Sequence, residues 1–222
     1  MSEHRLVIFD FCGTLIRFQT ADRYVSFCLR NAPQSKSTRL RQFLVRTMEK
    51  LKLFKIYNRI NKANNWHKRM ILWQLKGLDY STCDQLAQKY FEQELLPNEI
   101  APAVQQMQAH ITDGDRVCLL SGGYDIYIRH FAAHYGIQEY VSSRIEFQNG
   151  LCTGKMQGLD CMRGNKLVFF RELRKKGEHT IFYTDSISDI PLLEIVDEQI
   201  IVSHAAPQKW AEQRNYKQIL WN

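Results

Sequence analysis

The sequence predicts an α/β fold, a Rossmann-like doubly wound parallel sheet with an inserted all-helical cap. From residue 102 onward, short apolar runs alternate with segments of helical periodicity, and this alternation indicates parallel strands joined by crossover helices. Residues 20–96 instead contain one glycine, Gly77, and apolar residues at helical spacing, which predicts helices alone. The expected core is therefore residues 1–16 and 101–222, and the expected cap is residues 17–100.

The first expected strand is the apolar run at residues 5–9, which ends at Asp10 and is followed by a Phe-Cys-Gly-Thr turn. Within the cap, two apolar series at helical spacing are Phe43, Met48, Leu51 and Phe54, and then Ile60, Trp66, Met70 and Trp73. Ser81, with Asp84 three residues later, is the predicted N-cap of the last cap helix. Pro97 is expected to stop that helix.

After the cap, strands are predicted at 116–120, 140–144, 179–184 and 199–202, the last of these closing the sheet. Helices are predicted over 102–111, 124–135, 165–176, 189–195 and 207–214, with Gly177 as the C-cap of the third. Asn149-Gly150 lies between two extended segments and indicates a hairpin. Ligands of doubly wound sheets bind beyond the carboxyl ends of the strands. Because Asp10, Ser121 and Asp185 all follow predicted strands, we expect them to meet there.

The composition is that of a globular protein, with 45% hydrophobic and 24% charged residues in 222, enough for one large core carrying an insertion. The sequence shows no signal-peptide pattern and no apolar run of roughly 18 residues, the length that a membrane span needs. The six cysteines are scattered, without metal-ligand spacing, which argues against a zinc site or a disulfide framework. We expect reduced thiols and a cytoplasmic protein.

The positive charge is concentrated in the cap. The net charge is +7, and between Lys36 and Lys76 the only acid is Glu49. This excess favours an anionic partner. Two interpretations stay open: a solvated face over a helical core that contains Trp66, Met70 and Trp73, or a surface that contacts a polyanion or a membrane. No nucleic-acid-binding motif is present, so nucleic acid is not expected.

One set of polar residues carries the predicted chemistry: Asp10, Thr14, Ser121, Lys166, Asp185 and Asp189. Converging carboxylates repel unless a proton or a cation lies between them. Their oxygens suit Mg²⁺, which keeps several waters and takes substrate phosphate as a ligand. Lys166 and the Ser121-Gly122-Gly123 turn can offer positive charge, a hydroxyl and N–H groups to phosphate oxygens. The set therefore predicts Mg²⁺-dependent handling of a phosphorylated small molecule.

Four motifs in order resemble those of the haloacid dehalogenase superfamily. VIFDFCGTLI is similar to the first motif, D-x-D-G-T, and LLSGG to the second; Gly164-Asn165-Lys166 resembles the third, and FYTDSISDIPLLE the acidic fourth. A helical insertion between the first two motifs, the hairpin EFQNGLCTGKMQG and the late Ala-Glu-Gln-Arg segment are typical of its phosphoserine-phosphatase-like subclass.

The resemblance implies a role for each residue. Asp10 would attack phosphorus and form an aspartyl-phosphate. Asp10, the main-chain carbonyl of Cys12 and Asp185 would hold Mg²⁺, with Asp189 supporting the metal site. The phosphoryl group would be bound by Thr14, Ser121, Gly122 and Lys166. The implied activity is that of a phosphatase, a Mg²⁺-dependent phosphoric monoester hydrolase.

Cys12 departs from the family pattern. Phosphatases of the superfamily carry Asp at this position, where it protonates the leaving oxygen and later activates water. A thiol replaces that carboxyl poorly, and loss of a general acid or base costs about 10²–10⁴-fold in rate. Cys12 is then either a filler or a thiol catalyst or redox switch. Two alternative functions follow: a phosphate-binding protein with vestigial catalysis that acts through its basic cap, or phosphonate or phosphotransfer chemistry.

Overall fold

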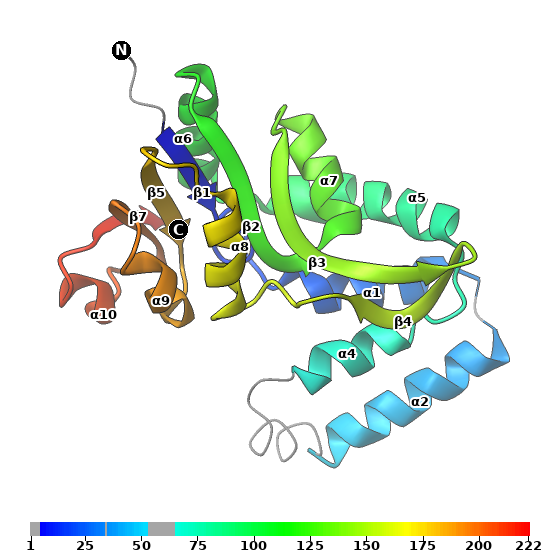
Figure 1. The fold of residues 1–222 in the computed structure, drawn as a ribbon. Helices are drawn as coiled ribbons and strands as arrows, with labels where there is room; N and C mark the ends of the chain where they lie inside the picture. Colours follow the sequence, from blue (N-terminus) through cyan, green and yellow to red (C-terminus); the bar gives the residue numbers. More distant parts are fainter. Residues whose placement is uncertain (1–4, 34, 53–64) are drawn as a thin grey trace.

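A seven-stranded sheet forms the centre of the computed structural model, which describes residues 5–33, 35–52 and 65–222. The strands run in the order β4-β3-β2-β1-β5-β6-β7 (Figure 1). Their bounds are β1 Arg5–Phe9, β2 Arg116–Tyr124, β3 Glu139–Gln148, β4 Leu151–Gln157, β5 His179–Thr184, β6 Glu198–His204 and β7 Lys217–Trp221. Neighbouring strands are parallel, except that β3 and β4 form an antiparallel hairpin.

Strand β1 lies at the centre of the sheet, between β2 and β5, and both of its faces are buried. Leu6 pairs with Arg116 of β2 on one side and with Thr180 of β5 on the other. Val7 and Phe9 pack into the larger hydrophobic cluster, and Leu6 and Ile8 pack into a second one. A strand covered on both faces reads as a continuous apolar run rather than an alternating one, which is the pattern at residues 5–9.

Helices cover both faces of the sheet. The larger cluster includes side chains from α1 (Thr20–Asn31), α5 (Tyr80–Tyr90), α6 (Ala101–Thr112) and α7 (Asp125–His134). The second cluster includes α8 (Asn165–Leu173), α9 (Ile190–Leu193) and α10 (Lys209–Glu212). A π-helical turn at Phe91–Leu95 and a 3₁₀ turn at Leu96–Asn98 follow α5.

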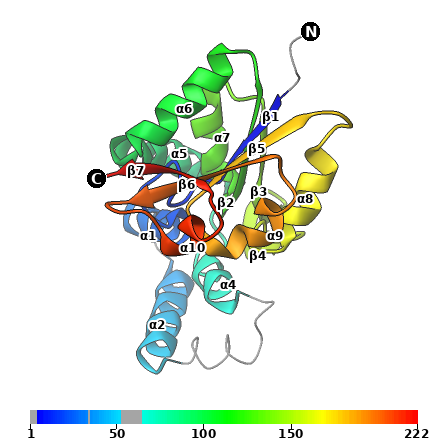
Figure 2. The same cartoon turned by 90° about the vertical axis from the view of Figure 1, so that its left-hand side faces the viewer.

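The segment predicted to be helical contains four helices in its described part: α1, α2 (Lys36–Lys50), α4 (Trp66–Trp73) and α5. Phe54 and Ile60 of the apolar series lie outside the described residues. Helices α2 and α4 project from the end of the molecule that carries the β3–β4 hairpin (Figure 1, Figure 2). The hairpin supports them, since the Gly77 N–H donates to the Cys152 carbonyl and the Cys152 N–H donates to the Leu78 carbonyl. The cap boundaries at 17 and 100 remain a prediction.

The structure corrects four local predictions. Residues 199–202 are not the last strand, because β7 follows. The edge strand β7 contains the short apolar run Ile219-Leu220-Trp221, and all of its residues are partly or largely exposed. Asp79, not Ser81, is the N-cap of α5, since its carboxylate accepts the Thr82 N–H at 2.8 Å. Helix α8 ends before Arg174, well short of Gly177. Helix α5 gives way to the π turn at Phe91, six residues before Pro97.

The remaining strands and helices lie where the sequence predicts them, within a few residues. The Asn149-Gly150 hairpin is present, and both residues have the positive φ angles that such a turn requires. Among the helices in the described part of the chain, none combines the length and apolar character that crossing a bilayer demands.

Candidate active site

The carboxyl ends of β2, β1 and β5 meet at one cavity of about 240 Å³. Seven of the eight predicted site residues line it: Asp10, Cys12, Ser121, Gly122, Lys166, Asp185 and Asp189. The eighth, Thr14, lies behind the wall and is fully buried. Residues separated by more than a hundred positions thus converge because β1 lies between β2 and β5 in a parallel sheet.

Asp10 directly follows β1, and its backbone extends the ladder with β5 by donating to the Tyr183 carbonyl at 2.9 Å. One carboxylate oxygen, Oδ1, accepts the Phe11 N–H at 2.7 Å. The other, Oδ2, lies 3.0 Å from Lys166 Nζ. Burial raises the pKa of Asp10 to about 6, although the charge of Lys166 opposes the rise. The residue is therefore a buried carboxylate whose negative charge depends on nearby cations.

Lys166 bridges Asp10 and Asp189 from the first turn of α8. Its Nζ lies 2.7 Å from Asp189 Oδ2, which also accepts the Thr184 hydroxyl at 2.7 Å. Burial lowers the pKa of Lys166, but the two carboxylates more than offset this, so the pKa is raised overall. Lys166 is thus a fixed cation beside Asp10. Asp189 is 2% exposed and orients the ammonium group.

Asp185 follows β5 and faces Asp10 across the cavity. Its Oδ1 accepts the Thr14 hydroxyl at 3.3 Å. Burial, and then the negative charge of Asp10, raises the pKa of Asp185 to about 7. Gly13 has φ +79° and lies so close to Asp185 that a Cβ atom there would overlap its carboxylate. Thr14 and Gly13 therefore set the position of Asp185, which accounts for the Gly-Thr pair after Cys12.

A bulged turn at the C-terminal end of β2, between Ser121 and Tyr124, brings Ser121 and Gly122 to the cavity. The register with β3 shifts between Ser121 and Tyr124, so the chain bulges there. Ser121 Oγ accepts the Gly123 N–H at 3.0 Å, which fixes the hydroxyl within the turn. A Cβ atom on Gly122 would overlap the Met162 side chain. The small residues of this turn are needed because the loop before α8 packs directly on it.

Cys12 lines the cavity next to Asp10, and its Sγ lies 3.0 Å from the Thr20 hydroxyl. The Thr20 hydroxyl in turn lies 2.6 Å from the buried Tyr127 hydroxyl. Burial, and then the charge of Asp10, raises the pKa of the Cys12 thiol to about 11. The thiol is consequently neutral at physiological pH. A neutral thiol is a weak acid and cannot act as a base.

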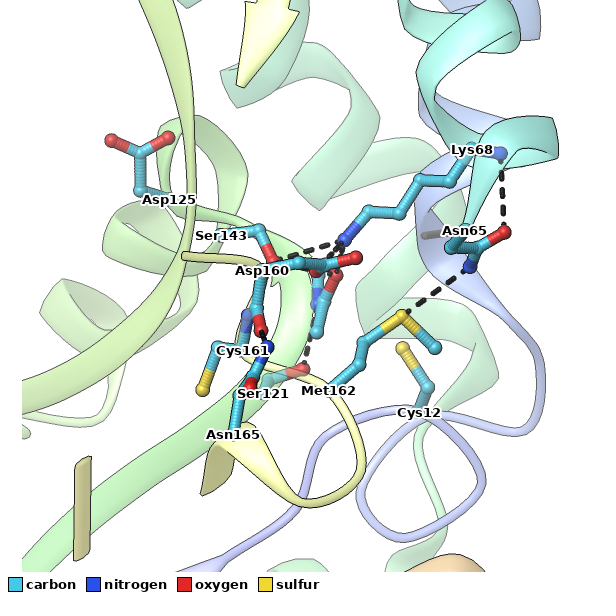
Figure 3. Close-up of polar contacts among 12 residues, drawn as sticks. Cys12, Asn65, Lys68, Ser121, Asp125, Ser143, Asp160, Cys161, Met162 and Asn165 are labelled. Atoms are coloured by element: carbon cyan, nitrogen blue, oxygen red, sulfur yellow. Dashed lines mark hydrogen bonds and ion pairs between the residues drawn. The ribbon is translucent and has the colours of Figure 1, made fainter. Parts of the chain in front are cut away.

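A second group of residues at this site, not predicted from the sequence, is centred on Lys68 of α4. Lys68 is 3% exposed, and its Nζ donates to the Gly122 carbonyl at 2.6 Å, Ser143 Oγ at 2.9 Å and Asp160 Oδ1 at 2.5 Å (Figure 3). Burial lowers the pKa of Lys68, and Asp160 opposes this. In the sequence Lys68 is one cation in a basic run, so no local signal distinguished it.

The loop before α8 connects this group to the site. Asn165 Nδ2 donates to the Asp160 carbonyl at 2.8 Å, and Asn65 Nδ2 lies 3.6 Å from Met162 Sδ (Figure 3). Met162 and Arg163 line the cavity from the same loop, and Arg163 has a positive φ angle. Residues of α4 and of this loop thus line the cavity together. Gln19, Asp22 and His67 also line it.

Residues 7–194 match the family described as haloacid dehalogenase-like hydrolase. The chain belongs to this family. The predicted family and its hydrolase class are thereby confirmed. Among curated proteins, the histidinol-phosphatase of Neisseria meningitidis serogroup C (strain 8013) is 26% identical over 140 residues. The alignment covers 57% of this chain and 63% of that protein, so the similar part spans less than two thirds of the relative.

Several solved structures share the fold. A protein with unknown function from Bordetella pertussis Tohama I has a TM-score of 0.77 at 21% identity, over 98% of this chain and 99% of that one. A substrate-bound phosphoserine phosphatase has a TM-score of 0.62 at 16% identity, over 99% and 94% of the two chains. Cytosolic 5′-nucleotidase IIIB bound to cytidine has a TM-score of 0.61 at 15% identity, over 97% of this chain and 80% of that one. The predicted Rossmann-like fold is thereby confirmed.

The donor set at the mouth of β1 and β5 fits a hard divalent cation. Burial, and then repulsion by Asp10, raises the pKa of Asp185, and a cation between the two carboxylates would offset both effects. In the described part of the chain, no group of three or more His, Cys, Asp and Glu side chains could hold a metal ion. The remaining ligands would be a main-chain carbonyl, water and substrate oxygens, a composition that Mg²⁺ prefers.

Proposed function

We propose that this hydrolase is a phosphatase that cleaves a phosphomonoester of a small molecule, with Asp10 as the nucleophile. The observation that supports the proposal is the position of Asp10. Its carboxylate lies in the cavity within 3.0 Å of a buried lysine and beside the Ser121-Gly122 turn. A carboxylate held next to a phosphate-sized anion site can attack phosphorus, provided that the anion's charge is neutralised.

Each residue then has a defined part. Asp10 attacks the phosphorus and becomes an aspartyl-phosphate, while the phosphorus–oxygen bond to the leaving group breaks and the departing alcohol takes a proton from water. A second water then attacks the aspartyl-phosphate, which releases inorganic phosphate and restores Asp10. Lys166 neutralises the phosphoryl oxygens, and Asp189 holds its ammonium group in place. The Ser121 hydroxyl and the Gly122 turn bind the same oxygens, and Thr14 orients Asp185. Asp10, Asp185 and the Cys12 carbonyl would hold Mg²⁺, which supplies further positive charge for the phosphoryl group.

The substrate that we propose is a small anionic phosphate ester. The cavity, of about 240 Å³, is lined by the cations Lys68, Arg163 and Lys166 and by the carboxylates Asp10, Asp22, Asp185 and Asp189. An anionic phosphate would therefore need the charge of a bound Mg²⁺ in addition to these cations. The names of the similar proteins, histidinol-phosphatase, phosphoserine phosphatase and 5′-nucleotidase, also point to an ester of this kind. Cap residues such as Gln19, Asp22 and His67 face the part of the substrate beyond the phosphate.

One observation favours a second candidate, a phosphate-binding protein with slow turnover. The neutral thiol of Cys12 lies where the leaving oxygen needs a proton and where water later needs a base. Formation of the aspartyl-phosphate can proceed with an acidic leaving group, but its hydrolysis lacks a base. The intermediate would then persist, and phosphotransfer to another acceptor would compete with hydrolysis.

The proposal is tested by phosphate release from an aryl phosphate and from a panel of alkyl phosphometabolites, with Mg²⁺ or with EDTA. We expect Mg²⁺-dependent release that Asp10→Asn abolishes. Asp113→Asn, at an exposed carboxylate outside the cavity, should behave like the wild type. Turnover by Asp10→Asn at the wild-type rate would exclude Asp10 as the nucleophile, and a trapped phosphoprotein without release would favour the second candidate.

A further inference from the structure

Helix α2 carries an exposed apolar strip that nothing in the catalytic site uses. Leu40, Phe43, Leu44 and Leu51 are 60%, 66%, 42% and 62% exposed. Leu40, Phe43 and Leu44 are three or four residues apart, with Leu51 two turns further on, so they lie on one face of the helix and its C-cap. The other exposed large apolar side chains of the described residues are scattered over other elements. A contiguous exposed strip of this kind marks an interaction surface.

A basic strip lies directly beside the apolar one. Lys36, Arg39, Arg46 and Lys50 are exposed, and at 100° per residue they occupy the neighbouring sector of the helix. The opposite face packs inward, where Val45 is 1% and Thr38 is 5% exposed. The outward face of α2 is therefore half apolar and half cationic.

Acidic groups are absent from this outward face. Glu49 is the only acid of α2, and its carboxylate lies 3.4 Å from His67 Nε2 of α4, on the inner side. Arg41 also belongs to the inner side, because it donates to the Lys76 carbonyl and lies over the Trp73 ring. In the described residues of α2, only positive charges thus remain beside the apolar strip, and they favour an anionic partner.

Helix α2 is placed for contact with a large surface. It lies at the outer end of the molecule, away from the sheet, in both views (Figure 1, Figure 2). Its inner face contacts α4, whose residues His67 and Lys68 line the catalytic cavity. A surface bound by α2 would therefore lie next to the cap rather than across the sheet.

We propose that the outward face of α2 docks this protein on an anionic lipid bilayer. The headgroups would pair with the basic strip, while Leu40, Phe43, Leu44 and Leu51 would enter the acyl boundary. A nucleic acid would satisfy the cations but leave the apolar strip exposed to water. The cap surface foreseen from Trp66, Met70 and Trp73 is not the docking face, because these side chains pack against the hydrophobic core.

Vesicle sedimentation of the whole chain tests the proposal, with phosphatidylglycerol-containing vesicles and pure phosphatidylcholine vesicles at low and high salt. The wild type should sediment with the anionic vesicles, and high salt should weaken binding because it screens the basic strip. Leu40→Ser with Phe43→Ser should weaken binding by about tenfold or more through lost apolar burial. Arg39→Gln with Arg46→Gln should do the same on anionic vesicles.

The matched controls are Leu159→Ser and Lys176→Gln, which change an exposed leucine and an exposed lysine elsewhere. Both should sediment like the wild type, and all variants should keep the wild-type circular dichroism spectrum and melting temperature. The proposal would be overturned if the wild type did not sediment with anionic vesicles. It would also be overturned if the control variants lost as much vesicle binding as the α2 variants. A dimer seen by size-exclusion chromatography without vesicles, and abolished by Leu40→Ser with Phe43→Ser, would assign the face to a second copy instead.

Discussion

The thiol of Cys12 lies in the cavity beside Asp10, the proposed nucleophile, where hydrolysis of a phosphate ester would need proton transfer. Its neighbours are the Asp10 carboxylate and the Thr20 hydroxyl. Both the burial of the sulfur and the charge of Asp10 disfavour a thiolate, and the pKa is raised to about 11. The hydroxyl chain through Thr20 to Tyr127 ends in the buried core. Cys12 therefore provides neither an acid of suitable strength nor a base at neutral pH, which favours the filler interpretation over a thiol catalyst.

Restoring a carboxyl group is the direct test of this view. Cys12→Asp should raise the turnover of alkyl phosphates by roughly 10²-fold or more, the usual effect of a positioned acid or base. Aryl phosphates, whose leaving groups need less protonation, should gain less. Steady-state rates for both substrate types check this, with Cys12→Asn as the isosteric control. A wild type already efficient on alkyl phosphates and no slower than Cys12→Asp would show that another group transfers the proton.

Alkylation reports the state of the thiol itself. Because the thiolate is the reactive form, Cys12 in the folded protein should react slowly with iodoacetamide, its rate rising about tenfold per pH unit up to pH ~11. Burial also raises the pKa of the other five cysteines. Mass spectrometry should find little modification near pH 7 in the native protein and six modified thiols after denaturation. Rapid, selective modification of Cys12 near pH 7 would instead reveal a reactive thiolate.

The connection between α4 and the sheet depends on the buried ammonium of Lys68. It contacts the Gly122 carbonyl at the end of β2, Ser143 of β3 and Asp160 of the loop before α8. One side chain thus connects α4, the end of β2 and the loop that leads to Lys166. A buried charge pair has specific geometry, and loss of one partner leaves the other uncompensated.

Replacing Lys68 should therefore destabilise the fold more than replacing an exposed lysine would. We expect Lys68→Met to lower the free energy of unfolding by about 3 kcal/mol, because Asp160 is left buried without its partner. Lys68→Met with Asp160→Leu should recover part of this loss. Urea denaturation in a double-mutant cycle checks the coupling. Exposed Lys89→Met serves as the control and should change stability by less than about 0.5 kcal/mol; additive effects of the two site substitutions would contradict the coupling.

The stability of the whole molecule should reflect the two carboxylates at its site. Burial raises the pKa of Asp10 to about 6 and that of Asp185 to about 7, from an ordinary 3.8. At pH values between 3.8 and these raised pKa values, the two carboxyl groups keep their protons in the folded protein and lose them in the unfolded chain. Stability in EDTA should therefore fall as the pH rises from about 4 to about 7.

Mg²⁺ should reverse this loss, because a cation between the carboxylates stabilises their charged forms. At a concentration near 100 Kd it should stabilise the fold by about 2.7 kcal/mol, or raise the melting temperature by about 5–10 °C. Thermal unfolding with Mg²⁺ and with EDTA, at several pH values, measures both effects. Asp185→Asn should be less sensitive to pH in EDTA and should gain little from Mg²⁺. An equal Mg²⁺ shift in Asp185→Asn would place the cation elsewhere.

The patterns of the sequence determined the parallel core and the site residues that follow its strands or open its helices. Apolar runs ending in Asp10, Ser121 and Asp185 identify buried strands and their polar ends, and the order of strands and helices makes those ends converge. Lys166 was predicted because Gly164-Asn165-Lys166, at the start of a predicted helix, resembles the third motif of the family. These features depend on interactions between residues close in the chain, or on the general geometry of a parallel sheet.

Only the tertiary structure decided which cap residues reach the site and which faces stay exposed. Lys68 and Arg39 are similar cations in one basic run, yet Lys68 is buried against Asp160 while Arg39 lies on the surface of α2. Likewise, Trp73 packs against the core and Phe43 is exposed, although both belong to apolar series at helical spacing. Periodicity indicates that a helix has an apolar face, but contacts with distant segments, here the hairpin and the loop before α8, determine what covers that face.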